Sequence, residues 1–160
     1  MTKQQYTKPY IQRQVSGMMN KFGQSSILKP MTDFDSIKIE DLVEQYGSPL
    51  FVFSQKRIQQ KYRELSQLLK LQYSKVQLSW SYKTNYLDAI CRCFHREGAW
   101  AEVVSEFEYD KAIHLGVPPS TIVVNGPMKS GSLFKKCFKG DSLINLDHFD
   151  ELCLAEKVAS

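Results

Sequence analysis

A lysine ends a run of alternating side chains, and it is the residue best placed to do chemistry. From Val76 to Lys83 (VQLSWSYK), large apolar residues alternate with small polar ones. Successive side chains of a strand point to opposite faces, so one face is predicted to be apolar and the other small, polar and ended by an amine. A partly desolvated amine is more often uncharged and can attack a carbonyl group. The run therefore predicts nucleophilic amine chemistry at Lys83.

The cysteines and histidines form no constellation of their own. The cysteines make no C-x-x-C pair and no zinc spacing with the histidines, so reduced thiols, a cytoplasmic protein and no bound metal are expected. The histidines fall in or near predicted helices and are expected to have surface or packing roles. The cysteines are Cys91, Cys93, Cys137 and Cys153, and the histidines are His95, His114 and His148.

The net charge of +4 is unevenly placed, because residues 1–32 carry five basic and no acidic side chains, leaving −1 (4 − 5) for the rest. A basic arm can bind nucleic acid or an anionic membrane, but here the charge is sparse and the aromatic residues are scattered. Residues 1–36 are therefore expected to be a basic N-terminal extension, with nucleic-acid binding left as an alternative. No apolar run approaches the roughly 18 residues of a membrane helix, so no membrane partner is expected.

The elements that must position Lys83 follow from hydrophobic periodicity. Residues 37–75 are predicted as a lead-in segment with a short strand within 46–53 (YGSPLFVF) and a helix over about 55–70 capped by Ser54. Strand-like runs then begin near Leu78, Ala101, Ile122 and Leu143, at spacings of 23, 21 and 21 residues. Helices are predicted between and after them, from about 87 to Gly98, from Ser105 to Gly116, over 131–139 and over 148–159.

This βαβαβαβα order leaves room only for parallel crossovers. An open doubly wound sheet and a (β/α)8 barrel both fit, and the regular units without a glycine-rich first loop favour the barrel. Four units would leave two open edges, so residues 76–160 are predicted as the first half of a barrel and the chain as part of a longer protein. Ser79, Ser81 and Lys83 would line the interior, with Lys83 at the carboxyl end, where barrel active sites lie.

Four blocks occur in order over roughly residues 40–160: YGSPLFVFS, SYKTN, AEVVSEFEYDKAIHLGVPPSTIVVNGPMKS and INLDHFDEL. Together they resemble the fold-type-III pyridoxal-phosphate-dependent decarboxylases, nearest the diaminopimelate type, with ornithine and arginine decarboxylases as relatives and alanine racemase more distant. The resemblance implies an alanine-racemase-like TIM-type barrel, of which about the first four βα units are present. It also implies pyridoxal 5′-phosphate as cofactor, an amino-acid substrate and a homodimer when full length.

Two residues are implied to be catalytic. Lys83 resembles the lysine that forms the internal aldimine with the cofactor. Glu102 stands where the family usually has an aspartate at the end of the second strand, so the charge is kept with an added methylene. Ser81, small and on the same face as Lys83, leaves room for a planar ligand and is expected to contribute to the cofactor pocket.

Two further residues, Glu108 and Asn125, match family positions near the cofactor. Glu108 also completes a capping box with Ser105, which is expected to be its main role. Lys129 matches a family position as well and is expected to face solvent, while Asp147 is expected to cap the last helix.

The resemblance implies the N-terminal portion of a diaminopimelate-decarboxylase-like enzyme. Its phosphate-binding and substrate-specificity residues would lie outside these 160 residues, so the chain alone is expected to be inactive. A non-catalytic homologue acting as a regulatory or binding partner, and a pyridoxal-phosphate-dependent racemase, remain as alternatives. The substrate is not specified by these residues.

Overall fold

The computed structural model describes residues 31–160, and the chain divides into two compact units, 1–51 and 52–160. The described part of the first unit is an antiparallel hairpin of β1 (Asp33–Phe34) and β2 (Ile37–Lys38), followed by helix α1 (Ile39–Tyr46). Asp35 and Ser36 both have positive φ, 50° and 69°, which gives the two-residue turn that suits the twist of a hairpin. These three elements were not predicted, and residues 1–30 of the expected basic extension lie outside the described residues.

The strand predicted within 46–53 does not form, because residues 48–54 are neither helical nor extended in a sheet. A strand is held by hydrogen bonds to a neighbour, and no strand among residues 31–160 pairs with this segment. Phe51 and Phe53 are accordingly 88% and 52% exposed. The segment is an apolar run, but an apolar run alone does not make a strand.

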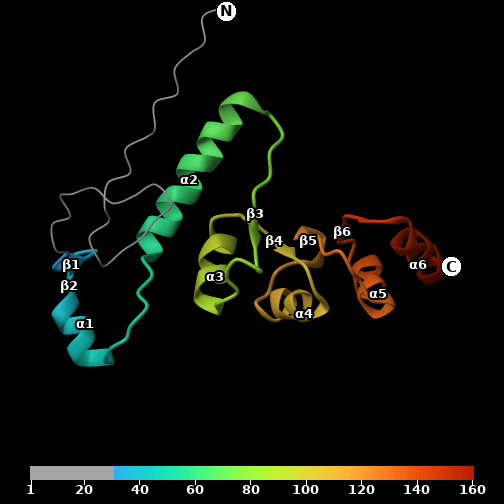
Figure 1. Ribbon diagram of the computed structural model, residues 1–160. Coiled ribbons are helices and arrows are strands. Elements are labelled where there is room, and N and C mark those ends of the chain that lie inside the picture. The colour runs from blue at the N-terminus through green and yellow to red at the C-terminus, as the bar shows by residue number, and fades with distance from the viewer. Residues whose placement is uncertain (1–30) are drawn as a thin grey trace, which may run out of the picture. The chain divides into compact units, whose positions relative to one another are not determined.

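The second unit confirms the predicted alternation of helices and strands (Figure 1). It begins with the long helix α2 (Gln55–Gln72), which Ser54 caps by accepting a hydrogen bond from the Arg57 backbone. The strands are β3 (Ser79–Ser81), β4 (Trp100–Val103), β5 (Ile122–Val124) and β6 (Leu143–Ile144). The helices after them are α3 (Asp88–Arg96), α4 (Glu106–His114), α5 (Gly131–Lys139) and α6 (Phe149–Ala159). In the part of the chain that is described, no helix has the length and apolar character to cross a membrane.

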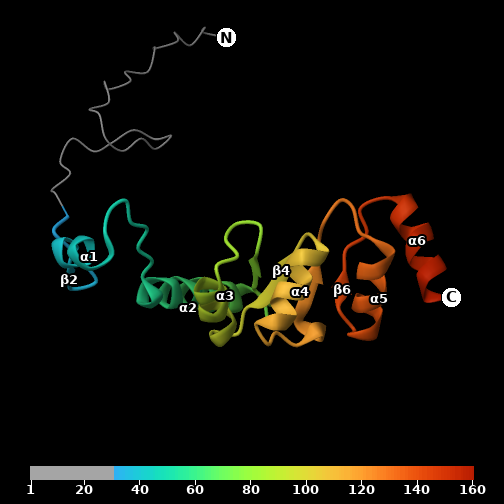
Figure 2. The ribbon, with the colours of Figure 1, turned by 90° about the horizontal axis from the view of Figure 1, so that it is seen from below.

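The four strands form one parallel sheet in the order β3-β4-β5-β6. Each strand lies beside the one that precedes it, so the order never reverses as it does in a doubly wound sheet. Helices α3, α4 and α5 lie along one side of the sheet, as the two views show (Figures 1 and 2). Sequential parallel strands with their helices on one side are the arrangement of a (β/α) barrel wall, which is the architecture predicted.

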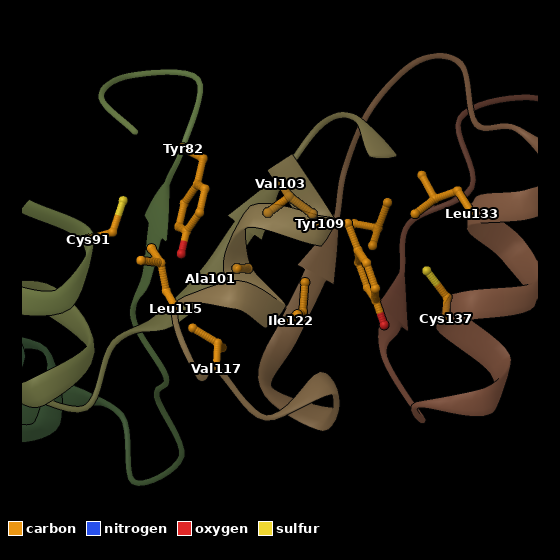
Figure 3. Close-up of a cluster of buried hydrophobic side chains, with 12 residues drawn as sticks. Tyr82, Cys91, Ala101, Val103, Tyr109, Leu115, Val117, Ile122, Leu133 and Cys137 are labelled. Carbon is orange, nitrogen blue, oxygen red and sulfur yellow. The ribbon is translucent and has the colours of Figure 1, made fainter. Parts of the chain in front are cut away.

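The hydrophobic core lies between the sheet and these helices (Figure 3). Ala101, Val103, Ile122 and Val124 are fully buried on the helix side of β4 and β5. At β3 the same side carries Trp80, whose ring stacks on Phe94 of α3 with centroids 3.8 Å apart. The prediction that the large apolar residues of the opening run face the helices is therefore confirmed.

Local capping explains where helices α4 and α5 begin and where α3 ends. Ser105 and Ser130 each accept a hydrogen bond from the backbone of the third helical residue of α4 and α5. Gly98 follows α3 with a φ of 94°, a conformation that glycine adopts without strain. The expected cap of α6 by Asp147 is wrong, since His148 occupies that position and makes no side-chain cap.

Candidate functional site

Lys83 lies on a tight turn at the carboxyl end of β3. The strand ends at Ser81, the Tyr82 N–H still donates to Glu102 O (2.9 Å), and the Thr84 N–H closes the turn on Ser81 O (3.1 Å). The Lys83 side chain is exposed, so the prediction that its amine is partly desolvated is wrong for this structure. The physical reason is that strands β3–β6 leave their second face partly open, as the partial exposure of Trp100 and other residues on it shows.

The predicted residues Ser81, Glu102 and Asn125 are brought together beside this turn. Ser81 pairs in register with Glu102, which places both on the open face of the sheet. Asn125, just after β5, donates its amide to Glu102 Oε1 at 3.2 Å. Among the described residues the Ser81 hydroxyl oxygen is buried without a hydrogen-bond partner, and no ion pair joins Lys83 to Glu102.

Glu108 is buried, and its hydrogen bonds stabilise the start of helix α4. Its carboxylate accepts the Val104 N–H at 2.8 Å, while its own N–H donates to Ser105 Oγ at 3.2 Å. The predicted capping role is confirmed, with the difference that the carboxylate reaches the residue before the cap. Direct contact with a cofactor stays a prediction for this residue.

The expectation that Lys129 faces solvent is wrong. Its side chain is 1% exposed and forms an ion pair of 2.7 Å with Glu151 of α6, and it also donates to Gly126 O. Glu151 accepts the Asp147 N–H as well, at 3.0 Å. Burial raises the pKa of Glu151, but the hydrogen bonds from Lys129 and Asp147 outweigh it and hold that pKa below its usual range.

The Lys129–Glu151 ion pair joins the segment after β5 to helix α6, which follows β6, at the same end of the sheet as Lys83. Sequence reasoning missed it because the two partners are far apart in the chain. The one local signal was the position of Glu151, three residues into its helix as Glu108 is in α4.

The histidines confirm the predicted packing and surface roles. His95 is half-buried, with Nε2 2.8 Å from the Tyr82 hydroxyl and Nδ1 2.9 Å from Ala99 O. Burial lowers the pKa of His95 despite the hydrogen bond to Ala99. His114 and His148 are exposed. Within residues 31–160 no group of three His, Cys, Asp or Glu side chains could hold a metal ion.

An apolar pocket of about 490 Å³ lies elsewhere, between α2, β3 and α3. Its walls include Tyr62, Leu65, Trp80 and Phe94, which belong to the helix side of the sheet. Lys83, Glu102 and Asn125 are absent from its lining. The residues able to do chemistry therefore gather on the open face, away from this pocket.

Comparison with known proteins agrees with the geometry. The diaminopimelate decarboxylase of Zymomonas mobilis is 28% identical over 128 residues, 79% of this chain and 30% of that protein. The diaminopimelate decarboxylase of M. jannaschii, solved in complex with L-lysine, has a TM-score of 0.72 at 29% identity, over 79% of this chain and 30% of that one. The lysine/ornithine decarboxylase of Vibrio vulnificus, solved with putrescine, has a TM-score of 0.64 at 25% identity, over 74% and 32%.

The chain thus spans about 30% of the length of these relatives. Residues 55–160 match the family described as pyridoxal-dependent decarboxylase, pyridoxal binding domain. The cofactor of this family is pyridoxal phosphate, and the fold seen here is that of its TIM-type barrel, with four βα units present. With two thirds of its length covered by that match, the chain belongs to the pyridoxal-dependent decarboxylases and carries part of their cofactor-binding domain.

Proposed function

We propose that this chain is the N-terminal portion of an amino-acid decarboxylase of the diaminopimelate type, in which Lys83 holds the cofactor. The observation that carries the proposal is the Lys83 turn, which presents an exposed amine at the carboxyl edge of the parallel sheet. In (β/α) barrels this edge is where active sites are built. When bound, pyridoxal phosphate supplies an electron sink for the bond that is broken at the amino acid's α-carbon.

The residues beside Lys83 fit an aldehyde cofactor with a flat ring. The buried Ser81 hydroxyl has a hydrogen to donate and, among the described residues, no partner to receive it. Glu102 is partly exposed on the same face of the sheet as Ser81, and one of its oxygens accepts a hydrogen bond from the Asn125 amide. In this proposal Lys83 would hold the cofactor and release it to the substrate amine. Ser81 would bind the cofactor, and Glu102 would exchange a proton with the Lys83 amine.

The wider assignments rest on the relatives. Their names support an amino-acid substrate of the diaminopimelate, lysine or ornithine kind, and we propose a cytoplasmic homodimer for the full-length enzyme. The proposal also includes that these 160 residues alone show little turnover. A non-catalytic homologue is the second candidate, favoured by the longer Glu102 in place of the usual aspartate.

Covalent labelling tests the role of Lys83. The chain is incubated with pyridoxal phosphate, the imine is reduced with borohydride, and pyridoxyl-lysine is quantified by peptide mass spectrometry. We expect Lys83 to be labelled well above Lys135, an exposed lysine of α5 that serves as an internal control. Equal labelling of the two lysines would refute the proposal. Activity against diaminopimelate, lysine and ornithine is then followed as CO2 release, with chirality change as the sign of a racemase.

A further inference from the structure

A chain of hydrogen bonds starts at the residue before Lys83. Tyr82 is fully buried, and Figure 3 shows its ring directed into the core cluster. Its hydroxyl lies 2.8 Å from His95 Nε2, and His95 Nδ1 lies 2.9 Å from Ala99 O. A carbonyl oxygen only accepts, so Nδ1 carries the hydrogen and Nε2 is the acceptor. Tyr82 therefore donates to a neutral imidazole, whose tautomer is set by Ala99.

A second tether holds the other side of the turn. The Trp80 indole N–H donates to Asn85 O at 2.9 Å, and the Trp80 ring itself is stacked on Phe94. Lys83 thus sits between two attachments to the helix side of the sheet, one through Tyr82 and one at Asn85. The backbone that carries the exposed amine is fixed by side chains packed beneath it.

The surroundings of His95 leave Tyr82 as its principal polar side-chain partner. The hollow beside His95, about 300 Å³, is lined from β4 and the segment before β5 by residues without a titratable group, among them Trp100, Leu115 and Thr121. Two charged side chains of neighbouring helices are engaged elsewhere, since Arg63 of α2 pairs with Glu97 at 2.6 Å and Lys111 of α4 pairs with Asp88. On α3 itself, Arg92 donates to Leu115 O at 3.4 Å.

We propose that Tyr82 and His95 are positioning residues, which hold the turn so that the Lys83 amine meets the cofactor's aldehyde, and that protonation of His95 loosens this hold. The inference rests on the proposed function of Lys83. A protonated Nε2 donates to the Tyr82 oxygen instead of accepting from its hydroxyl, so the hydrogen bond reverses. The Tyr82 hydroxyl hydrogen is then left in a buried place with only the weakly accepting Cys91 sulfur beside it, which weakens the attachment of the turn through Tyr82. Lys83 would then react more slowly in mild acid than the chemistry of the amine alone requires.

The experiment measures the rate of reductive labelling of Lys83 by pyridoxal phosphate relative to Lys135 in the same chain, from about pH 5 to pH 8, the range in which histidine titrates. Tyr82→Phe removes one hydrogen bond and is expected to lower the ratio about twofold to tenfold near neutral pH. His95→Gln places a carbonyl oxygen near the position of Nε2, so it is expected to keep the neutral ratio and to abolish the additional fall in acid. His114→Gln, at an exposed histidine, is the matched control and should leave both unchanged.

Two labelling results would overturn the inference alone: a Tyr82→Phe chain with native circular dichroism and an unchanged ratio, or identical pH profiles for the wild type and His95→Gln. If Tyr82→Phe fails to fold, the second comparison decides. Equal labelling of Lys83 and Lys135 in the wild type would instead remove the proposed function and the inference with it. Long-range ¹H–¹⁵N spectra of His95 give a readout without cofactor, since the structure requires the Nδ1–H tautomer, and the other tautomer would also overturn the inference.

Discussion

Replacing Glu151 by glutamine removes one charge of a buried ion pair while keeping the shape of the side chain. The two side chains are 1% and 3% exposed, and their nitrogen and oxygen are 2.7 Å apart. Removing one partner of such a pair leaves the other charge buried without compensation, which costs about 3–5 kcal/mol. Urea denaturation followed by circular dichroism measures the loss, and Glu64→Gln is the control because its pair with Lys61 is exposed at the surface.

A double variant separates the pairing from the burial of each charge. Lys129→Met combined with Glu151→Leu fills the same space with apolar atoms, so it should be less destabilising than either single change. Because the pKa of Glu151 is lowered, its contribution is complete above its ordinary value of 4.5 and is lost as the pH falls through the lower folded value. The glutamine variant should lose that acid-dependent part. A destabilisation no greater than that of Glu64→Gln, or strictly additive single effects, would refute the reasoning.

Two further predictions concern backbone packing and surface charge. Gly126→Ala would drive a methyl group into the Val104 carbonyl and is expected to destabilise the fold by about 1–3 kcal/mol. Gly131→Ala is the control, because its added carbon would meet only side chains, at 3.6 Å or more, and should not destabilise the fold. Thermal unfolding of the two variants checks this. Hydrogen bonds from Ser132, Lys136 and Ser130 lower the pKa of Glu106 to about 2, so Ser132→Ala should raise it in an NMR titration, and an unchanged value would contradict the assignment.

The parts of the fold that sequence could predict are those set by local chemistry. Ser54 and Ser105 begin their helices because a serine oxygen accepts a backbone N–H three residues on, an interaction contained in four consecutive residues. The strands from 79 to 144 were predictable because their apolar residues repeat with the helices at a steady interval. The strand expected within 46–53 failed because pairing depends on a neighbour, which no local pattern specifies.

In the candidate site, too, local patterns and element order were predictable from sequence and long-range contacts were not. Ser81 and Glu102 lie at the carboxyl ends of neighbouring parallel strands and Asn125 directly follows the next strand, so their meeting at one edge could be expected from the order of elements. The burial of Lys129 could not, because its partner lies in another βα unit. The exposure of Lys83 also escaped prediction, since it depends on how much of a barrel closes over the sheet.

The hydrogen-bond partners of the acidic residues at the carboxyl edge of the sheet indicate which of them have a structural role. Glu108 and Glu151 are both buried, and each accepts the N–H of the residue that precedes its helix cap, Val104 and Asp147. Such carboxylates hold the backbone at the junction between strand and helix. Glu102 differs, because it is partly exposed and its hydrogen bond comes from the Asn125 side chain. Of these three carboxylates, Glu102 is therefore the one that is not bound to the backbone of a strand–helix junction.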